Sequence, residues 1–306
     1  MKIYSTAEYV LRLPEGHRFP MEKYRLLHER VISSLSLDED QIETPPEATD
    51  LQLSRAHDWD YIHAAQNGLL GETAMKKIGF PWSKEFVKRS RLSSGATIES
   101  ARQAIREGYG INLAGGTHHA FRDHGEAYCL FNDSVLAIRA VQIEENIQRG
   151  LIIDLDVHQG NGSAAICQGD QSIFTFSMHG EKNYPLKKEK SNLDVPLPDK
   201  TSDREYLDQL LIHLPKVIEL ARPGIAIYVS GADAYAGDQL GRLSLTKQGL
   251  RDRDSIVVEY CQSHGIPLVL TMAGGYASNV LDTVDIHYQS VMTVMSRANR
   301  SIEYQT

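Results

Sequence analysis

The chain alternates short, continuous apolar runs with longer segments in which apolar residues recur every three to four positions. Such runs are typical of buried parallel strands, and such a recurrence is typical of helices with one buried face. The predicted strands are residues 1–4, 111–114, 151–157, 173–178, 225–230 and 267–273. The predicted helices are residues 21–35, 58–67, 83–91, 95–107, 132–148, 203–221, 246–264 and 279–298.

Capping and turn residues separate the predicted helices from the predicted strands. Asn132 or Asp133 can cap the helix that ends before Gly150, and Thr246 can cap a later one. The sequence contains no internal repeat, no low-complexity tract and no Ser/Gly linker. Uninterrupted alternation of strands and helices predicts one α/β domain over residues 1–306, doubly wound or similarly built from three layers. In such open sheets, ligands bind beyond the carboxyl ends of the strands.

Composition is typical of an ordinary globular protein. The 306 residues are 42% hydrophobic and 24% charged. The 32 Lys and Arg against 40 Asp and Glu give a net charge of −8, which opposes direct binding to nucleic acid. No apolar run approaches the roughly 18 residues of a membrane span, and the N-terminal residues lack the apolar core of a signal peptide. Three widely spaced cysteines, Cys129, Cys167 and Cys261, form no disulfide framework or zinc motif, so we expect a cytoplasmic protein without membrane association.

Polar clusters follow four of the predicted strands. They are AGGTHHA (114–120), DLDVHQGNG (154–162), SGADAYAGD (230–238) and MAGGYA (272–277). Each cluster alone has a plain structural explanation as a turn, a loop or a helix entry. Because all four follow apolar strands, we expect them to converge on one pocket at the carboxyl edge of the sheet.

The second of these clusters is expected to bind a metal ion. In an extended chain Asp154, Asp156 and His158 share one face, while the aliphatic residues between them share the other. Two carboxylates and an imidazole at an apolar strand end are costly to desolvate unless a divalent cation pairs with them. Asp156 and His158 can bind one ion from a single strand end, and Asp233 can complete a set of three. Three protein ligands leave room for water and a substrate oxygen, which is typical of a catalytic site.

Together, GGTHH, DLDVHQGNG, GADAYAGD and GGY resemble the motifs of the metal-dependent histone deacetylase superfamily. The resemblance extends from residue 1 to about residue 295, and DVHQGNG is most similar to the class IV branch and its bacterial relatives. It implies a single deacetylase domain with an arginase-like, three-layer α/β/α fold and a mostly parallel central sheet. That sheet would contain two strands beyond those that the pattern predicts.

The resemblance also implies roles for individual residues. His119 is expected to take a proton from water and give one to the departing amine, while His118, held by Asp154, stabilises charge. The Tyr276 hydroxyl is expected to bind the scissile carbonyl and then the oxyanion. Asn161 stands where many family members have an aspartate behind the second histidine; an amide orients that ring but cannot stabilise its charged form. The implied zinc ligands are Asp156, His158 and Asp233.

Further positions match the family's substrate tunnel and a structural ion site. Tyr128 and Tyr184 match the aromatic residues that line the acyl-lysine tunnel, where the family more often has Phe. Leu240 lies where polyamine-selective relatives carry a glutamate, so its apolar side chain disfavours a polyamine-specialised enzyme. The implied site for a structural K⁺ or Na⁺ ion consists of Asp154, Asp156, His158, Ser177 and Met178.

These residues favour a zinc-dependent amidohydrolase that removes acetyl or longer acyl groups from lysine ε-amines of proteins or peptides. Acetylpolyamines or another small acylated amine are the alternative substrates. Two carboxylate ligands make a weaker Lewis acid than three histidines would and admit Fe²⁺ in place of Zn²⁺. A non-catalytic acyl-lysine-binding module would require a broken catalytic set, and an arginase-like binuclear hydrolase would require further Asp and His ligands.

Overall fold

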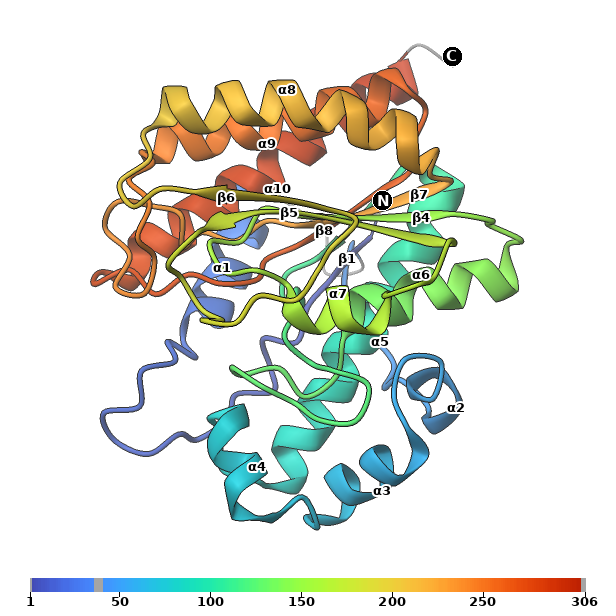
Figure 1. The fold of residues 1–306 in the computed structure, drawn as a ribbon, viewed down its shortest axis with the longest axis vertical. Helices are drawn as coiled ribbons and strands as arrows, with labels where there is room; N and C mark the ends of the chain where they lie inside the picture. Colours follow the sequence, from blue (N-terminus) through green and yellow to red (C-terminus); the bar gives the residue numbers. More distant parts are fainter. Residues whose placement is uncertain (1, 36–40, 304–306) are drawn as a thin grey trace.

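The computed structural model describes residues 2–35 and 41–303, which form an eight-stranded parallel sheet with helices on both faces (Figure 1). Its order, β2-β1-β3-β8-β7-β4-β5-β6, confirms the expected α/β fold and the two additional strands. Residues 1, 36–40 and 304–306, which the single-domain prediction includes, lie outside the described residues. The strands are β1 (Ile3–Tyr4), β2 (Ile42–Glu43), β3 (Tyr109–Asn112), β4 (Gly150–Asp154), β5 (Ile173–Gly180), β6 (Leu193–Leu197), β7 (Ile225–Val229) and β8 (Leu268–Thr271).

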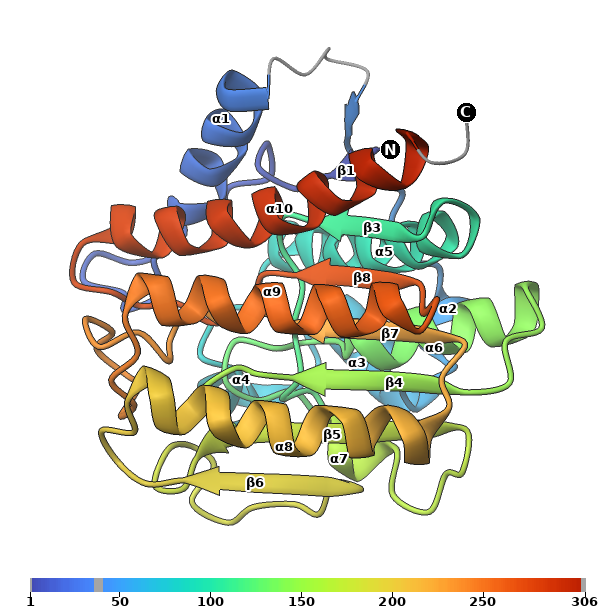
Figure 2. The same cartoon turned by 90° about the horizontal axis from the view of Figure 1, so that it is seen from above.

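Helices cover both faces of the sheet. α8, α9 and α10 lie side by side on one face, with α1 packed beside α10 (Figure 2). α5, α6 and α7 lie on the other face, and α2, α3 and α4 lie farther from the sheet (Figure 1). The helices are α1 (Lys23–Leu35), α2 (Asp50–Leu53), α3 (Trp59–Asn67), α4 (Gly71–Ile78), α5 (Lys84–Glu107), α6 (Asp133–Glu144), α7 (Asn161–Ile166), α8 (Asp203–Ala221), α9 (Lys247–Ser263) and α10 (Val280–Glu303).

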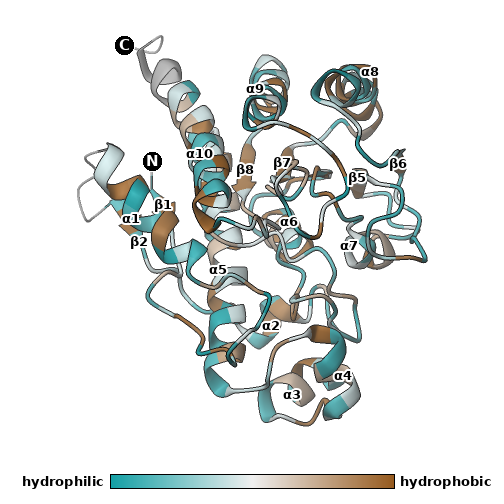
Figure 3. Ribbon diagram, turned by 90° about the vertical axis from the view of Figure 1, so that its left-hand side faces the viewer, coloured by the Kyte–Doolittle hydropathy of each residue, from teal (hydrophilic) through white to brown (hydrophobic). Residues whose placement is uncertain are grey.

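Two apolar cores lie on opposite faces of the sheet, and β4 contributes to both. Leu151, Ile153, Leu155 and Val157 belong to the core that includes residues of α8, α9 and α10, while Ile152 belongs to the core that includes residues of α5 and α6. The side chains therefore alternate between faces as predicted from the sequence. Figure 3 shows the apolar β8 within the sheet and hydrophilic segments on the outer helices α8 and α9.

α5 is one continuous helix, so the predicted break between residues 83–91 and 95–107 is wrong. Ser83 caps its start, and its side chain accepts a hydrogen bond from the Phe86 N–H. Gly95 lies in its interior, where a Cβ atom would stand 1.8 Å from the carbonyl oxygen of Pro46. The glycine therefore serves close packing against a neighbouring segment rather than helix termination.

The sequence pattern missed β2, β6, α2, α4 and α7. β2 has only two residues, and β6 contains Pro196, which weakens a strand pattern but is tolerated at the edge of a sheet. The predicted helix 132–148 ends earlier, at Glu144. Among the described residues, every helix is too short or too polar to cross a membrane.

The topology brings the four polar clusters together. They follow β3, β4, β7 and β8, which are neighbours in the order β3-β8-β7-β4. Because the strands are parallel, their carboxyl ends lie at one edge of the sheet. The predicted convergence on one site is thus a direct result of strand order.

Candidate active site

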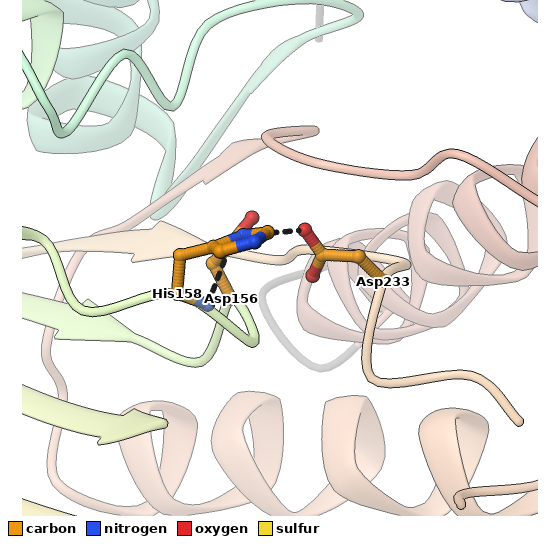
Figure 4. A group of neighbouring side chains, drawn as sticks. All are labelled: Asp156, His158 and Asp233. Carbon is orange, nitrogen blue, oxygen red and sulfur yellow. Dashed lines mark hydrogen bonds and ion pairs between the residues drawn. The ribbon is translucent and has the colours of Figure 1, made fainter. Parts of the chain in front are cut away.

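Three potential metal ligands meet at the carboxyl ends of β4 and β7 (Figure 4). Asp156 and His158 follow β4, Asp233 follows β7, and one ligand atom from each lies within 4.8 Å of the others. His158 Nδ1 lies 3.0 Å from Asp156 Oδ1 and 3.2 Å from Asp233 Oδ2. β4 and β7 pair directly, so strand register joins ligands that are distant in the sequence.

The electrostatics of these three ligands favour a bound cation. Although burial opposes ionisation of the ring, the carboxylates of Asp156 and Asp233 raise the pKa of His158 to about 10. Burial and the charge of Asp156 raise the pKa of Asp233 to about 7. Asp233 Oδ2 is buried and, apart from its ion-pair contact with His158, has no polar partner among the described residues. Two buried carboxylates and one imidazole nitrogen therefore fit a divalent ion that accepts oxygen and nitrogen ligands, such as Zn²⁺ or Fe²⁺.

The glycine pair after β8 lets the backbone approach these ligands closely. The Gly274 N–H donates a hydrogen bond to Asp156 Oδ2 at 2.8 Å. A Cβ atom on Gly274 would lie only 1.9 Å from Asp233 Oδ2, and Gly275 has φ +148°. Only glycine fits these positions, so the pair fixes the path of the chain that leads to Tyr276.

Arg253, on α9, connects the two segments that carry the ligands. It is completely buried, and its Nη1 donates hydrogen bonds to the carbonyl oxygens of Leu155 (3.2 Å) and Gly231 (2.7 Å). These residues lie one and two positions before the ligand aspartates. The neighbouring Asp254 balances the guanidinium charge. Arg253 therefore fixes the separation of the ligand segments, a role for which its helix gave no sequence signal.

His118 and His119 lie side by side, with ring centroids 4.1 Å apart. His118 Nδ1 lies 2.7 Å from Asp154 Oδ2. Although burial opposes it, the charges of Asp154 and Asp156 raise the pKa of His118 to about 9. Burial and the adjacent His118 hold the pKa of His119 well below its usual range. At neutral pH one ring is thus protonated and the other neutral, which suits an electrostatic stabiliser beside a general base.

Asn161 and Glu126 together determine which nitrogen of His119 carries the proton. Asn161 Oδ1 lies 2.6 Å from His119 Nδ1, and Asn161 Nδ2 donates a hydrogen bond to Glu126 Oε2 at 3.3 Å. Because a carboxylate only accepts hydrogen bonds, Glu126 fixes the orientation of the amide. Nδ1 of His119 then donates to the amide oxygen, and Nε2 is left as the acceptor that a base requires.

Glu126 also positions an aromatic ring beside the histidine pair. The Tyr184 hydroxyl donates a hydrogen bond to Glu126, and the Tyr184 ring packs edge-on against His119 at a centroid distance of 5.1 Å. The Glu126 carboxylate therefore lies on the far side of the Asn161 amide from His119. Asn161 occupies the position where the resemblance leads us to expect an aspartate. In the sequence, no motif position marks Glu126.

Asp133, at the start of α6, holds the loop that carries the histidine pair. Its carboxylate accepts hydrogen bonds from the N–H groups of Gly116 (2.9 Å) and Thr117 (2.8 Å) and from the hydroxyl of Thr97 (2.6 Å). Asp133 is completely buried, so these bonds compensate its desolvation. In the sequence, Asp133 is recognisable only as a candidate helix cap.

A cavity of about 60 Å³ lies beside the metal ligands. Tyr276 lines it, and its ring centroid is 6.1 Å from those of Phe19 and Tyr128. Burial raises the pKa of Tyr276 well above its usual range, so its hydroxyl stays protonated and can donate a hydrogen bond. Tyr128 also contacts Phe80 at 5.2 Å, which extends the aromatic wall.

The remaining predicted positions are placed less directly. Leu240 does not line the cavity; its backbone bonds to Asp238 and Asn183 instead. Ser177 lies opposite Asp154 in the register of β4 and β5, followed by the buried Met178. A structural K⁺ or Na⁺ ion at these strand ends stays a prediction.

Several cavity residues come from segments that the sequence motifs do not mark. They lie in the N-terminal segment and in the region up to the first half of α5, and all but Arg89 are aromatic residues that resembled ordinary core residues in the sequence. These additional lining residues are Phe19, Tyr24, Phe80, Phe86 and Arg89.

Known proteins are similar to this chain in sequence. An uncharacterized protein of Picosynechococcus sp. is 40% identical over 96% of this chain and 97% of its own length. Histone deacetylase 2 of Arabidopsis thaliana is 29% identical, covering 90% of this chain and 74% of that protein. The acetoin utilization protein AcuC of Staphylococcus aureus is 27% identical, covering 89% and 76%.

A solved structure has the same fold. The crystal structure of a histone deacetylase homolog from Aquifex aeolicus matches with a TM-score of 0.80 at 22% identity, covering 96% of this chain and 84% of that one. Residues 17–292 match the family model described as the histone deacetylase domain. With strand-end clusters, fold and sequence in agreement, this chain belongs to the histone deacetylase family and has its arginase-like α/β fold.

Proposed function

We propose that the protein is a zinc-dependent amidohydrolase that removes acetyl or longer acyl groups from lysine ε-amines of proteins. The observation that carries the proposal is the pair of adjacent buried histidines with opposite pKa shifts, next to three ligands for one cation. The same arrangement suits an acetylpolyamine or another small acylated amine, which is the alternative substrate class. Asp156, His158 and Asp233 would hold the zinc ion.

The proposed hydrolysis assigns one task to each side chain. When bound, zinc would polarise the scissile carbonyl and lower the pKa of the attacking water. His119 Nε2 takes a proton from that water as its oxygen bonds to the carbonyl carbon, and it later gives the proton to the amine as the C–N bond breaks. The Tyr276 hydroxyl donates a hydrogen bond to the oxyanion, and protonated His118, held by Asp154, stabilises the negative charge. The products are a carboxylate and a free amine.

A binuclear, arginase-like reaction is less well supported. Among the residues that the structure describes, only one group of three His, Cys, Asp or Glu side chains is arranged to hold a metal ion. The Tyr276 hydroxyl would also have no task in that reaction.

The test is to measure hydrolysis by the zinc-loaded protein on acetyl-lysine peptides, longer acyl-lysine peptides and acetylpolyamines. We expect the highest kcat/KM on an acyl-lysine peptide, loss of activity after chelation, and recovery with Zn²⁺. Preferential hydrolysis of acetylpolyamines would select the alternative substrate class. Failure to hydrolyse any of these amides, with zinc bound, would refute the proposal.

A further inference from the structure

The backbone of Tyr276, the proposed oxyanion donor, is attached to the loop that follows Asp233. The Tyr276 N–H donates a hydrogen bond to Asp238 Oδ2 at 2.6 Å, and the Tyr276 carbonyl accepts one from the Gln239 N–H at 3.2 Å. Asp238 also pairs with Ala277 in an isolated antiparallel bridge. The main chain at the tyrosine is therefore bound to this loop at several adjacent points.

The carboxylate of Asp238 also organises its own loop. Its Oδ1 accepts hydrogen bonds from the N–H groups of Leu240 (2.8 Å) and Gly241 (2.9 Å). One carboxylate oxygen thus shapes the turn that begins at Asp238, while the other holds Tyr276. Asp238 is partly buried, and hydrogen bonds to a charged acceptor are stronger than those between neutral groups. One side chain therefore connects the turn to the tyrosine.

The loop that carries Asp238 is itself held against the site. A Cβ atom on Gly241 would stand 1.8 Å from the carbonyl oxygen of Asp233, so the loop packs directly on the backbone of a metal ligand. The buried Asn183 donates a hydrogen bond to the Leu240 carbonyl at 2.8 Å. These contacts fix the loop from two sides, and Asp238 transmits that fixed position to the neighbouring chain.

The glycine pair on the other side of Tyr276 adds no side-chain support. Gly274 and Gly275 let the chain approach the ligands, but they carry no side chain that could hold the tyrosine. An oxyanion donor works only at about 2.7–3.1 Å from the oxygen, and a misplacement of about 1 Å can cost about 10²-fold in rate. The described residues that line the cavity include Tyr276 but not Asp238, so the carboxylate acts on the tyrosine from outside the cavity.

We propose that Asp238 is the positioning residue for Tyr276 and places its hydroxyl at the scissile carbonyl. The proposal rests on the proposed amide hydrolysis, in which that hydroxyl binds the oxyanion. It assigns the carboxylate no contact with the substrate or with the metal ion. Loss of the carboxylate should therefore lower kcat, with zinc content and KM nearly unchanged.

Asp238→Asn tests the carboxylate with little change in shape. An amide has one acceptor oxygen and one donor group, so it can accept from the Tyr276 N–H or from the two loop N–H groups, but not from both sides. The matched control is Asp203→Asn, because the Asp203 carboxylate likewise holds a backbone N–H, that of Thr246 (2.8 Å), at the start of α9. Folding is checked by circular dichroism and zinc content by elemental analysis.

We expect Asp238→Asn to lower kcat on an acetyl-lysine peptide at least about tenfold, with KM within about twofold of wild type and zinc retained. Asp203→Asn should leave kcat unchanged. A double-mutant cycle tests whether the effect passes through the tyrosine: in a Tyr276→Phe background, Asp238→Asn should lower kcat no further. Wild-type kcat in Asp238→Asn, loss of zinc from it, or losses that multiply in the double variant would each overturn the proposal.

Hydrogen exchange separates this proposal from the proposed function, because it requires no substrate. Amide exchange is followed by mass spectrometry on the peptide that contains Tyr276. Asp238→Asn should speed exchange of this amide about tenfold or more, and Asp203→Asn should not. Equal exchange in wild type and Asp238→Asn would overturn the proposal. Exchange that depends on Asp238, in a protein that cleaves no acylated amine, would refute the proposed function alone and leave the support of Tyr276 by Asp238 standing.

Discussion

Replacing Asn161 by aspartate should move the acid limb of the kcat/KM profile to higher pH. The new carboxylate would stand where the amide oxygen lies 2.6 Å from His119 Nδ1. It stabilises the imidazolium, so the pKa of His119 rises from its present value well below the usual range. A base with a higher pKa stays protonated, and hence inactive, up to a higher pH.

The size of this shift depends on Glu126. Two opposite charges about 4 Å apart attract by about 4 kcal/mol at an effective dielectric constant of about 20, which corresponds to about 3 pH units. Glu126 Oε2 is 3.3 Å from the atom that the second carboxylate oxygen would replace, so it would repel the new charge with similar strength. Without the glutamate charge, Asn161→Asp combined with Glu126→Gln should give the full shift of about 3 pH units relative to Glu126→Gln alone. With Glu126 present, repulsion keeps the new carboxylate partly protonated, so Asn161→Asp alone should give a smaller shift of about 1 pH unit.

The assay is kcat/KM against pH on one acetyl-lysine peptide for wild type, both single variants and the double variant. Glu126→Gln alone controls for the loss of the glutamate charge. An acid limb that stays in place or moves to lower pH in both aspartate variants would show that Asn161 does not orient the base. Equal shifts in the single and double variants would show that Glu126 carries no charge that matters here.

Four further predictions concern the ligands, the tyrosine and the buried arginine. Asp156→Ala and Asp233→Ala should each abolish zinc binding and activity, because only two protein ligands would remain. Elemental analysis measures the zinc content, and normal zinc content with normal turnover would exclude these residues as ligands. Tyr276→Phe should lower kcat about 10²-fold with zinc retained, and unchanged turnover would exclude the oxyanion role. Arg253→Leu should lower the free energy of unfolding in urea by about 3–5 kcal/mol, because a buried carboxylate loses its partner; a loss below about 1 kcal/mol would contradict this. Zinc affinity, measured against a competing chelator, should weaken as the pH falls below about 10, because protons compete for His158, and a flat profile would argue against this ligand.

The central strands and their polar ends could be predicted because both signals are local. A buried parallel strand is a continuous apolar run, and Asp156 and His158 follow such a run directly. β2 and β6 could not be predicted in this way, since one has two residues and the other contains a proline. The glycine in the middle of α5 suggested a break because its cause, the backbone of Pro46, comes from another part of the chain.

The supporting residues of the site were beyond prediction for a similar reason. Arg253 holds the backbone of Leu155, 98 positions away along the chain. Glu126 orients the side chain of Asn161, 35 positions away. Nothing next to them in the sequence distinguishes them from surface charges on a helix or a loop. Their roles follow from tertiary contacts, which only the folded chain reveals.

The place of β8 in the sheet bears on the order of events during synthesis. β8 is the last strand to leave the ribosome, yet it lies between β3 and β7 and pairs with both. The strands β1 to β3 and β4 to β7 do not pair with each other, so a nascent chain without β8 holds two separate half-sheets. Tyr276 lies five residues after the end of β8. An incomplete chain can therefore bring the metal ligands together on β4 and β7, but the proposed oxyanion donor arrives only when the two half-sheets join.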